Sequence, residues 1–184
     1  MKKTETNIAG LSDLTQTQIQ DLCLEMSRRW DDAARMLNEY ITNALENRDY
    51  TRPQSPEWEG YNRESENAQN RLGVARQAWR AYRNHPTVIQ MAEVVWKYMT
   101  HYQTDFYAHD IPRMASDPTR PFIWAVRPTG TWLLWTQDDN PSEAQTLLDY
   151  SRKEGNHIYF VGSLETGLRP VPDPENLVIS PMEP

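Results

Sequence analysis

The chain has 184 residues but only one cysteine, Cys23. A single cysteine cannot form an internal disulfide or a zinc site built from several thiolates, so the fold must depend on its hydrophobic core. Cys23 falls in the apolar stripe of a predicted helix, where we expect a small core residue. The absence of disulfides suits a reducing compartment and favours a cytoplasmic location.

Long apolar runs are also missing from the sequence. No stretch approaches the roughly 20 consecutive apolar residues needed to cross a bilayer. Two lysines near the N-terminus are not followed by the apolar segment of a secretory signal. The sequence therefore predicts neither a membrane partner nor export.

The short motifs of several common chemistries do not occur. There is no phosphate-binding loop of the GxxxxGK[ST] or GxGxxG type, no GxSxG elbow and no HExxH. The net charge of -7 disfavours non-specific binding to nucleic-acid phosphates. These absences lead us to expect no cofactor and no catalytic centre of these well-known kinds.

Aromatic residues are abundant, with seven tryptophans and nine tyrosines. A disordered chain of this polarity would be poor in aromatics, so most of the chain should fold. The length suits one domain with a proper core. We predict a single domain over residues 1–184, with a helical part at 12–111, a ββαββ part at 120–172 and an extended, proline-rich tail at 173–184.

Capping signals and apolar residues at helical spacing predict three helices, at residues 15–44, 65–83 and 87–110. Pro112 is expected to end the third helix, because the residue before a proline is pushed out of the α region. Residues 48–64 contain two prolines and a glycine, and we expect them to form a long loop between the first two helices.

The C-terminal part is predicted to contain strands on either side of one helix. Two β-rich runs surround a Pro-Thr-Gly turn in residues 121–137, a helix with Pro141 at its start and Gly155 at its end follows, and two strands come after it. Because strands are segregated from the first helices, the predicted fold class is α+β. An N-terminal three-helix layer of long antiparallel helices would pack on a small, mostly antiparallel ββαββ unit.

Large apolar side chains on the predicted β-hairpin are the candidate partner-binding residues: Phe122, Trp124, Trp132 and Trp135. Strand alternation distributes large apolar groups over both faces of the hairpin. Two alternatives follow. Either the sheet is covered on both faces, or one face is exposed and binds another protein or a second copy of the chain.

Residues 98–110, YMTHYQTDFYAHD, set His101, Asp105 and His109 at four-residue steps. Side chains four residues apart lie one above the other on a helix, so either neighbouring pair could supply two ligands of a metal ion. His101 and His109 would lie about 12 Å apart along the helix axis, so one ion cannot take all three. Together with Asp110, Asp105 and His109 are also the candidate acid–base catalytic groups. The structural alternative is a surface histidine followed by a helix end.

Residues 61–100 form a basic segment, with six basic and three acidic residues, between two acidic segments. Four arginines line one side of the predicted second helix: Arg71, Arg76, Arg80 and Arg83. They could contact nucleic acid, with Trp79 as a stacking neighbour. In an acidic protein we instead expect these arginines to pair with carboxylates of neighbouring elements.

By elimination, the sequence favours a non-enzymatic interaction protein of the adaptor or inhibitor type, of the kind found among phage and mobile-element accessory proteins. It would bind another protein through exposed aromatics and its acidic surface. One alternative is a small metal-dependent or acid–base enzyme that uses the His101, Asp105 and His109 helix face. The other is nucleic-acid binding through the Arg71–Arg83 segment.

Overall fold

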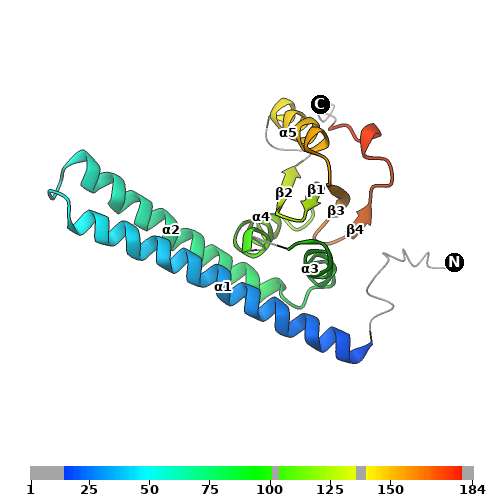
Figure 1. Ribbon diagram of the computed structural model, residues 1–184, viewed down its shortest axis with the longest axis horizontal. Helices are drawn as coiled ribbons and strands as arrows, with labels where there is room; N and C mark the ends of the chain where they lie inside the picture. Colours follow the sequence, from blue (N-terminus) through cyan, green and yellow to red (C-terminus); the bar gives the residue numbers. More distant parts are fainter. Residues whose placement is uncertain (1–14, 101–103, 136–139, 180–184) are drawn as a thin grey trace.

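The computed structural model describes residues 15–100, 104–135 and 140–179. Two long helices, α1 (Gln16–Asp49) and α2 (Pro56–Tyr82), form an antiparallel hairpin. Three shorter elements lie between this hairpin and a sheet (Figure 1): α3 (Pro86–Tyr98), the π-helical turn η1 (Phe106–Asp110) and α4 (Ile111–Ser116). The predicted α+β class is confirmed.

The sheet has four antiparallel strands in the order β2-β1-β3-β4. The strands are β1 (Phe122–Arg127), β2 (Gly130–Trp135), β3 (Ile158–Ser163) and β4 (Gly167–Pro170). Helix α5 (Pro141–Glu154) connects β2 to β3 and ends at Gly155, which has a positive φ of 69°. The predicted ββαββ order of these elements is therefore confirmed.

The sheet is covered on both faces. One face, which includes Phe122 and Trp124, packs against α3, η1, α4 and the hairpin. The other face, which includes Ile123 and Leu134, packs beneath α5 and the C-terminal segment. Phe122 and Trp124 are only 1% and 0% exposed. Of the two alternatives for the β-hairpin, burial is the one that holds for these two residues, and a partner cannot reach them.

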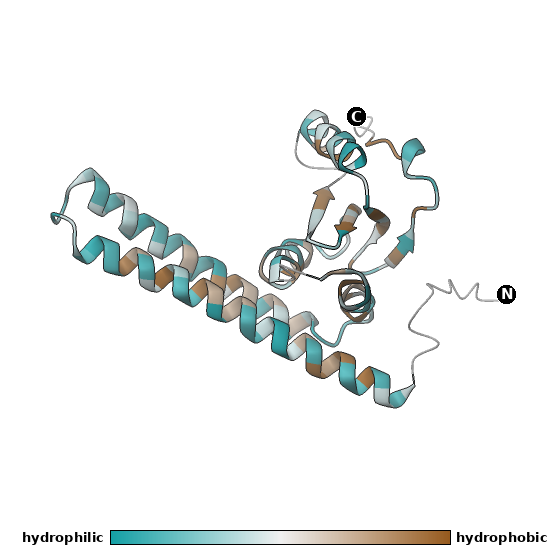
Figure 2. Ribbon diagram, in the orientation of Figure 1, coloured by the Kyte–Doolittle hydropathy of each residue, from teal (hydrophilic) through white to brown (hydrophobic). Residues whose placement is uncertain are grey.

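The end of the α1–α2 hairpin farthest from the sheet stands clear of the rest of the fold (Figure 1) and is mostly hydrophilic (Figure 2). Ala44, near the end of α1, is buried there. Arg48 donates a hydrogen bond to Asn62 at 3.1 Å and lies 5.8 Å from the Trp58 ring centroid. These contacts join the end of α1 to the start of α2, where no further element of the described structure packs against the hairpin.

The long loop predicted at residues 48–64 is wrong. Helix α2 begins at Pro56 because the Ser55 side chain accepts a hydrogen bond from the Trp58 N–H. A proline in the first helical turn sacrifices no hydrogen bond, since an N–H there has no helical partner. The real connection is a short turn at residues 50–55, in which Gln54 has a φ of 61°.

The continuous third helix predicted as far as Asp110 is also wrong. Helix α3 ends at Tyr98, because Met99 takes an extended conformation with ψ of 137°. The Thr100 N–H then donates to the Pro128 carbonyl at 2.8 Å. Pro112 lies inside the helical run of η1 and α4, not after its end. A π turn lets a helix change its hydrogen-bond register at such a point, and here the Ile111 N–H donates to the Phe106 carbonyl.

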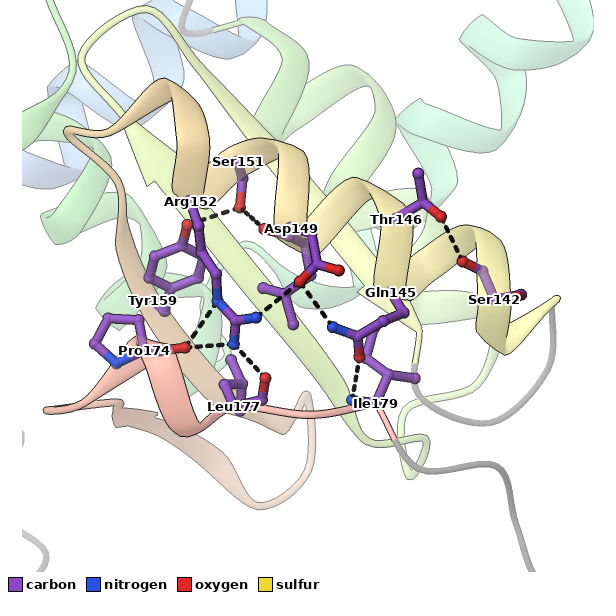
Figure 3. A network of polar contacts seen from close by, with 11 residues as sticks. Ser142, Gln145, Thr146, Asp149, Ser151, Arg152, Tyr159, Pro174, Leu177 and Ile179 are labelled. Atoms are coloured by element: carbon purple, nitrogen blue, oxygen red, sulfur yellow. Dashed lines mark hydrogen bonds and ion pairs between the residues drawn. The ribbon is translucent and has the colours of Figure 1, made fainter.

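Hydrogen bonds link the segment after β4, residues 174–179, to α5 (Figure 3). Arg152 donates to the carbonyl oxygens of Pro174 and Leu177 and pairs with Asp149 at 2.9 Å. The Ile179 N–H donates to the Gln145 side chain at 2.9 Å. These hydrogen bonds place the Ile179 side chain in the core beneath α5. Among the described residues, no helix combines the length and low polarity that a membrane span requires.

Trp79 should be a principal residue of the hairpin core. It is 5% exposed, stacks on Trp30 at 5.7 Å and meets Tyr107 edge-on at 5.5 Å. Trp79→Ala should lower the free energy of unfolding by about 3–5 kcal/mol, measured by urea denaturation. Leu24→Ala is the control, because Leu24 is 70% exposed on the same hairpin and should change stability by less than about 0.5 kcal/mol. Equal effects in the two variants would contradict this packing.

Arg152→Met should loosen the C-terminal segment while leaving the sheet intact, because it removes the donors to Pro174 and Leu177 but keeps an aliphatic side chain. We expect faster amide hydrogen exchange at residues 175–179 and unchanged exchange in β1. Lys153→Met, at an exposed neighbouring position, should change neither. Unaltered exchange at 175–179 in the Arg152 variant would show that the segment is held by its apolar contacts alone.

Candidate functional site

A groove of about 210 Å³ lies at the root of the hairpin, where α1 and α2 meet the turn η1. We call it the root groove. Helix α1 contributes Met36, Leu37 and Tyr40, helix α2 contributes Arg71, and the approach to η1 and the turn itself contribute Asp105 and His109. The groove thus joins an apolar wall to a polar one.

The apolar wall is formed by side chains that the fold leaves uncovered. Met36 and Tyr40 are one helical turn apart on α1 and are 49% and 50% exposed, whereas Ala33 and Ala44 on the same helix are buried. The apolar stripe of α1 is wider than the contacts with α2 and η1 can cover. Two half-exposed large side chains therefore lie side by side at the groove.

The polar wall is centred on Arg71 and His109. The Nη2 atom of Arg71 lies 2.9 Å from both Nδ1 and Nε2 of His109. A guanidinium can only donate, so the His109 nitrogen that accepts must be unprotonated. Burial and the positive charge of Arg71 both lower the pKa of His109, while Asp105 acts in the opposite direction. At neutral pH the polar wall therefore holds the Arg71 cation beside a neutral imidazole, and the carboxyl group of Asp105 lines the same groove.

Arg71 has no carboxylate within ion-pair distance among the residues that the structure describes. Its hydrogen-bond partner, His109, satisfies only part of its donor capacity, because a guanidinium carries five N–H groups. The remaining donors are free to bind an incoming anionic or carbonyl group.

The structure brings together only part of the chemical cluster predicted at residues 98–110. Asp105 and His109 both line the root groove. Asp110 instead points into the core and does not share their site. His101 lies outside the described residues. Within the described part of the chain, no group of three or more His, Cys, Asp or Glu side chains is placed to hold a metal ion.

Asp110 joins the turn η1 to the sheet. Its Oδ2 accepts hydrogen bonds from Trp124 Nε1 at 3.0 Å and Thr131 Oγ1 at 2.5 Å, which come from β1 and β2. Burial raises the pKa of Asp110 to about 6, although both hydrogen bonds act to lower it. The side chain is buried beneath the sheet, so its geometry fits a structural role and not contact with a substrate.

The predicted aromatic binding residues do not form one exposed surface. Phe122 and Trp124 are in the core, as described above. Trp132 is half-buried and stacks on Tyr150 of α5 at 5.7 Å. The side chain of Trp135 lies outside the described part of the structure.

Some residues on the apolar side that helical periodicity indicates for α1 are exposed and not buried. Tyr40 lies at the root groove, and Cys23 is exposed on α1, so the expectation of a core cysteine is wrong. The helical period identified the apolar side of α1 correctly but carried no information on how much of it would be covered. Met36 also lies beside that stripe. Its position next to Tyr40 is the sequence signal that could have indicated the groove and that sequence analysis missed.

Comparison of the chain with protein-family models, curated proteins and solved structures gave no match. The function must therefore be argued from the geometry of the chain itself. The root groove is the strongest candidate, because it combines exposed apolar side chains with a cation that lacks an ion pair in the described structure.

Asp110 should give the protein a characteristic pH dependence. Because its pKa in the fold is raised from 3.8 to about 6, the folded state binds this proton more tightly than the unfolded state. The stabilisation is complete below about pH 4 and is lost as pH rises through about 6. Relative to Asp110→Asn, the wild-type protein should lose up to about 3 kcal/mol of unfolding free energy between pH 4 and pH 7.

Urea denaturation of both proteins at several pH values between 4 and 7 measures this difference. Other titrating groups, including His109, are common to the two proteins and cancel in the comparison. A difference in stability that does not vary with pH would contradict the raised pKa of Asp110.

Proposed function

We propose that this protein is a non-enzymatic binding module of the adaptor or inhibitor type, which receives a segment of another protein in the root groove. The observation that carries the proposal is the position of Met36 and Tyr40, half exposed, beside the guanidinium of Arg71, which forms no ion pair among the described residues. This combination suits a partner segment in which a large apolar side chain is followed closely by a carboxylate.

The energetics of the groove support this choice. Covering the exposed parts of Met36 and Tyr40 stabilises a complex by about 25 cal/mol for each Å² of apolar surface removed from water. Arg71 can bind a carboxylate with two parallel hydrogen bonds, which adds orientation as well as affinity. The neutral state of His109 means that no second positive charge has to be desolvated with it.

The size of the groove favours a peptide side chain over a metabolite. Its volume of about 210 Å³ is below the roughly 300–1,000 Å³ typical of small-molecule sites. A stable protein–protein interface also needs about 800 Å² on each partner, more than this groove provides. We place the remaining contacts on the adjoining part of the hairpin, which stands clear of the sheet (Figure 1).

A metal-dependent or acid–base enzyme is the second candidate, because Asp105 and His109 line the same groove. It would have to work without Asp110, whose carboxyl group binds Trp124 and Thr131 in the core. Elemental analysis of the purified protein separates the two candidates. Stoichiometric metal that disappears in Asp105→Ala would favour the enzyme over the binding module.

The binding proposal predicts that partner recovery depends on the groove. In quantitative affinity capture from host lysate, the double variant Met36→Ser, Tyr40→Ser should recover the partner with affinity reduced about tenfold or more, a loss of at least 1.4 kcal/mol. Arg71→Gln should also reduce recovery, because it removes the cation while keeping a polar side chain. Circular dichroism should show that both variants remain folded.

Leu24→Ser is the matched control, since Leu24 is an exposed apolar residue of the same helix that does not line the groove. It should leave partner recovery unchanged. A partner captured equally well by the wild-type protein and both groove variants would rule out the root groove as its binding site.

A further inference from the structure

A second surface of α2 carries positive charge. Arg76, Arg80 and Arg83 follow one another at i, i+4 and i+7, and all three are exposed. At 100° per residue they fall within about 60° of the helix circumference. We call these three residues the basic row. Arg71 and Arg80 are separated by about 180°, so the basic row lies on the side of α2 opposite to the root groove.

Among the described residues the basic row has no carboxylate partner, so the expected pairing with neighbouring elements is not found there. Other arginines of the helices do form ion pairs: Arg28, Arg29, Arg35, Arg48 and Arg152. Like charges four residues apart destabilise a helix by a few tenths of a kcal/mol. The helix dipole favours cations only in the last turn, and Arg76 lies before it. The dipole therefore favours Arg80 and Arg83 at the end of α2 but gives Arg76 no such stabilisation.

A cleft of about 140 Å³ lies between α1 and α2 at the Arg83 end of the basic row. Arg83 and Asn84 line one side, and the small, exposed residues Cys23 and Ser27 of α1 line the other. Met26 and Trp79 are mostly buried and also line the cleft. The small α1 side chains leave room for another chain to approach Arg83 closely.

We propose that the basic row and its cleft dock an acidic, helical segment of a partner protein. A helix with carboxylates at i, i+4 and i+7 repeats the axial spacings of the three arginines, about 6.0 Å and 4.5 Å. The interaction goes beyond the root groove, because it uses the opposite side of α2 and different chemistry.

The charge of the whole chain distinguishes this occupant from nucleic acid. The net charge of -7 repels a long polyanion, which extends over much of the protein surface. A short acidic segment meets only the local field of the three arginines, since charges farther away than about 8–10 Å are screened at physiological salt. Charge complementarity therefore favours a protein segment.

The test is fluorescence anisotropy with a labelled, alanine-rich helical peptide that carries glutamates at i, i+4 and i+7. The wild-type protein should bind this peptide at low salt and should not bind the same peptide with glutamines. The triple variant Arg76→Glu, Arg80→Glu, Arg83→Glu should lower the affinity about tenfold or more, because three attractions become repulsions.

The matched control is the triple variant Arg52→Glu, Arg63→Glu, Arg169→Glu. These arginines are exposed and form no ion pair in the described structure, so the net charge changes by the same amount at other places. The control should keep most of the affinity. If the basic-row variant unfolds, the corresponding three changes to glutamine provide the same comparison without charge reversal.

Three results would overturn the proposal: no binding of the glutamate peptide, equal binding of the glutamine peptide, or equal loss of affinity in the two triple variants. A labelled DNA oligonucleotide provides a further comparison. If it binds through the basic row more tightly than the peptide and with steep salt dependence, the ligand of the row is nucleic acid and not an acidic protein segment. Because the root groove is unchanged in both triple variants, failure here does not count against the proposed function of that groove.

Discussion

The packing of the short turn η1 joins the long helical hairpin to the sheet. Tyr107 meets Trp79 edge-on, with ring centroids 5.5 Å apart, and the adjacent Phe106 lies 5.6 Å from Trp124 of β1. Asp110 on the same turn binds Trp124 and Thr131 of the two neighbouring strands. A single turn therefore contacts the hairpin on one side and the sheet on the other. It sets the position of α1 against the rest of the fold, and the root groove is formed at this junction.

The groove follows from a mismatch in length. Helix α1 has 34 residues and is about 50 Å long. It extends beyond the elements that cover its N-terminal half. An apolar stripe is normally buried against another layer, but η1 and α2 leave part of this stripe open at Met36 and Tyr40. A partner segment would complete the layer that the chain itself does not supply. The polar, free-standing end of the hairpin is compatible with water and needs no such cover.

The two sides of α2 present different chemistry. Towards η1, Arg71 contacts a neutral histidine at the edge of an apolar surface. On the opposite side, Arg83 of the basic row borders a cleft with small side chains. The first arrangement gains affinity mainly from burial of apolar surface, whereas the second acts mainly through charge and is weakened by salt. In the two binding modes that we propose, one hairpin would hold two protein segments of different character, as an adaptor requires.

The sequence by itself determined the α+β class, the order of the strands around α5 and the capping of α1 at Thr15, because turns, caps and apolar periods act between residues close in the chain. The start of α2 at Ser55 and Pro56 was also a local signal, but the nearby proline and glycine suggested a loop. Only the tertiary structure decided the break after Tyr98, where Thr100 binds the distant Pro128. It also decided that Trp124 is buried while Tyr40 and Cys23 are exposed. Periodicity identifies the apolar side of an element, but its coverage depends on contacts between residues far apart in the sequence.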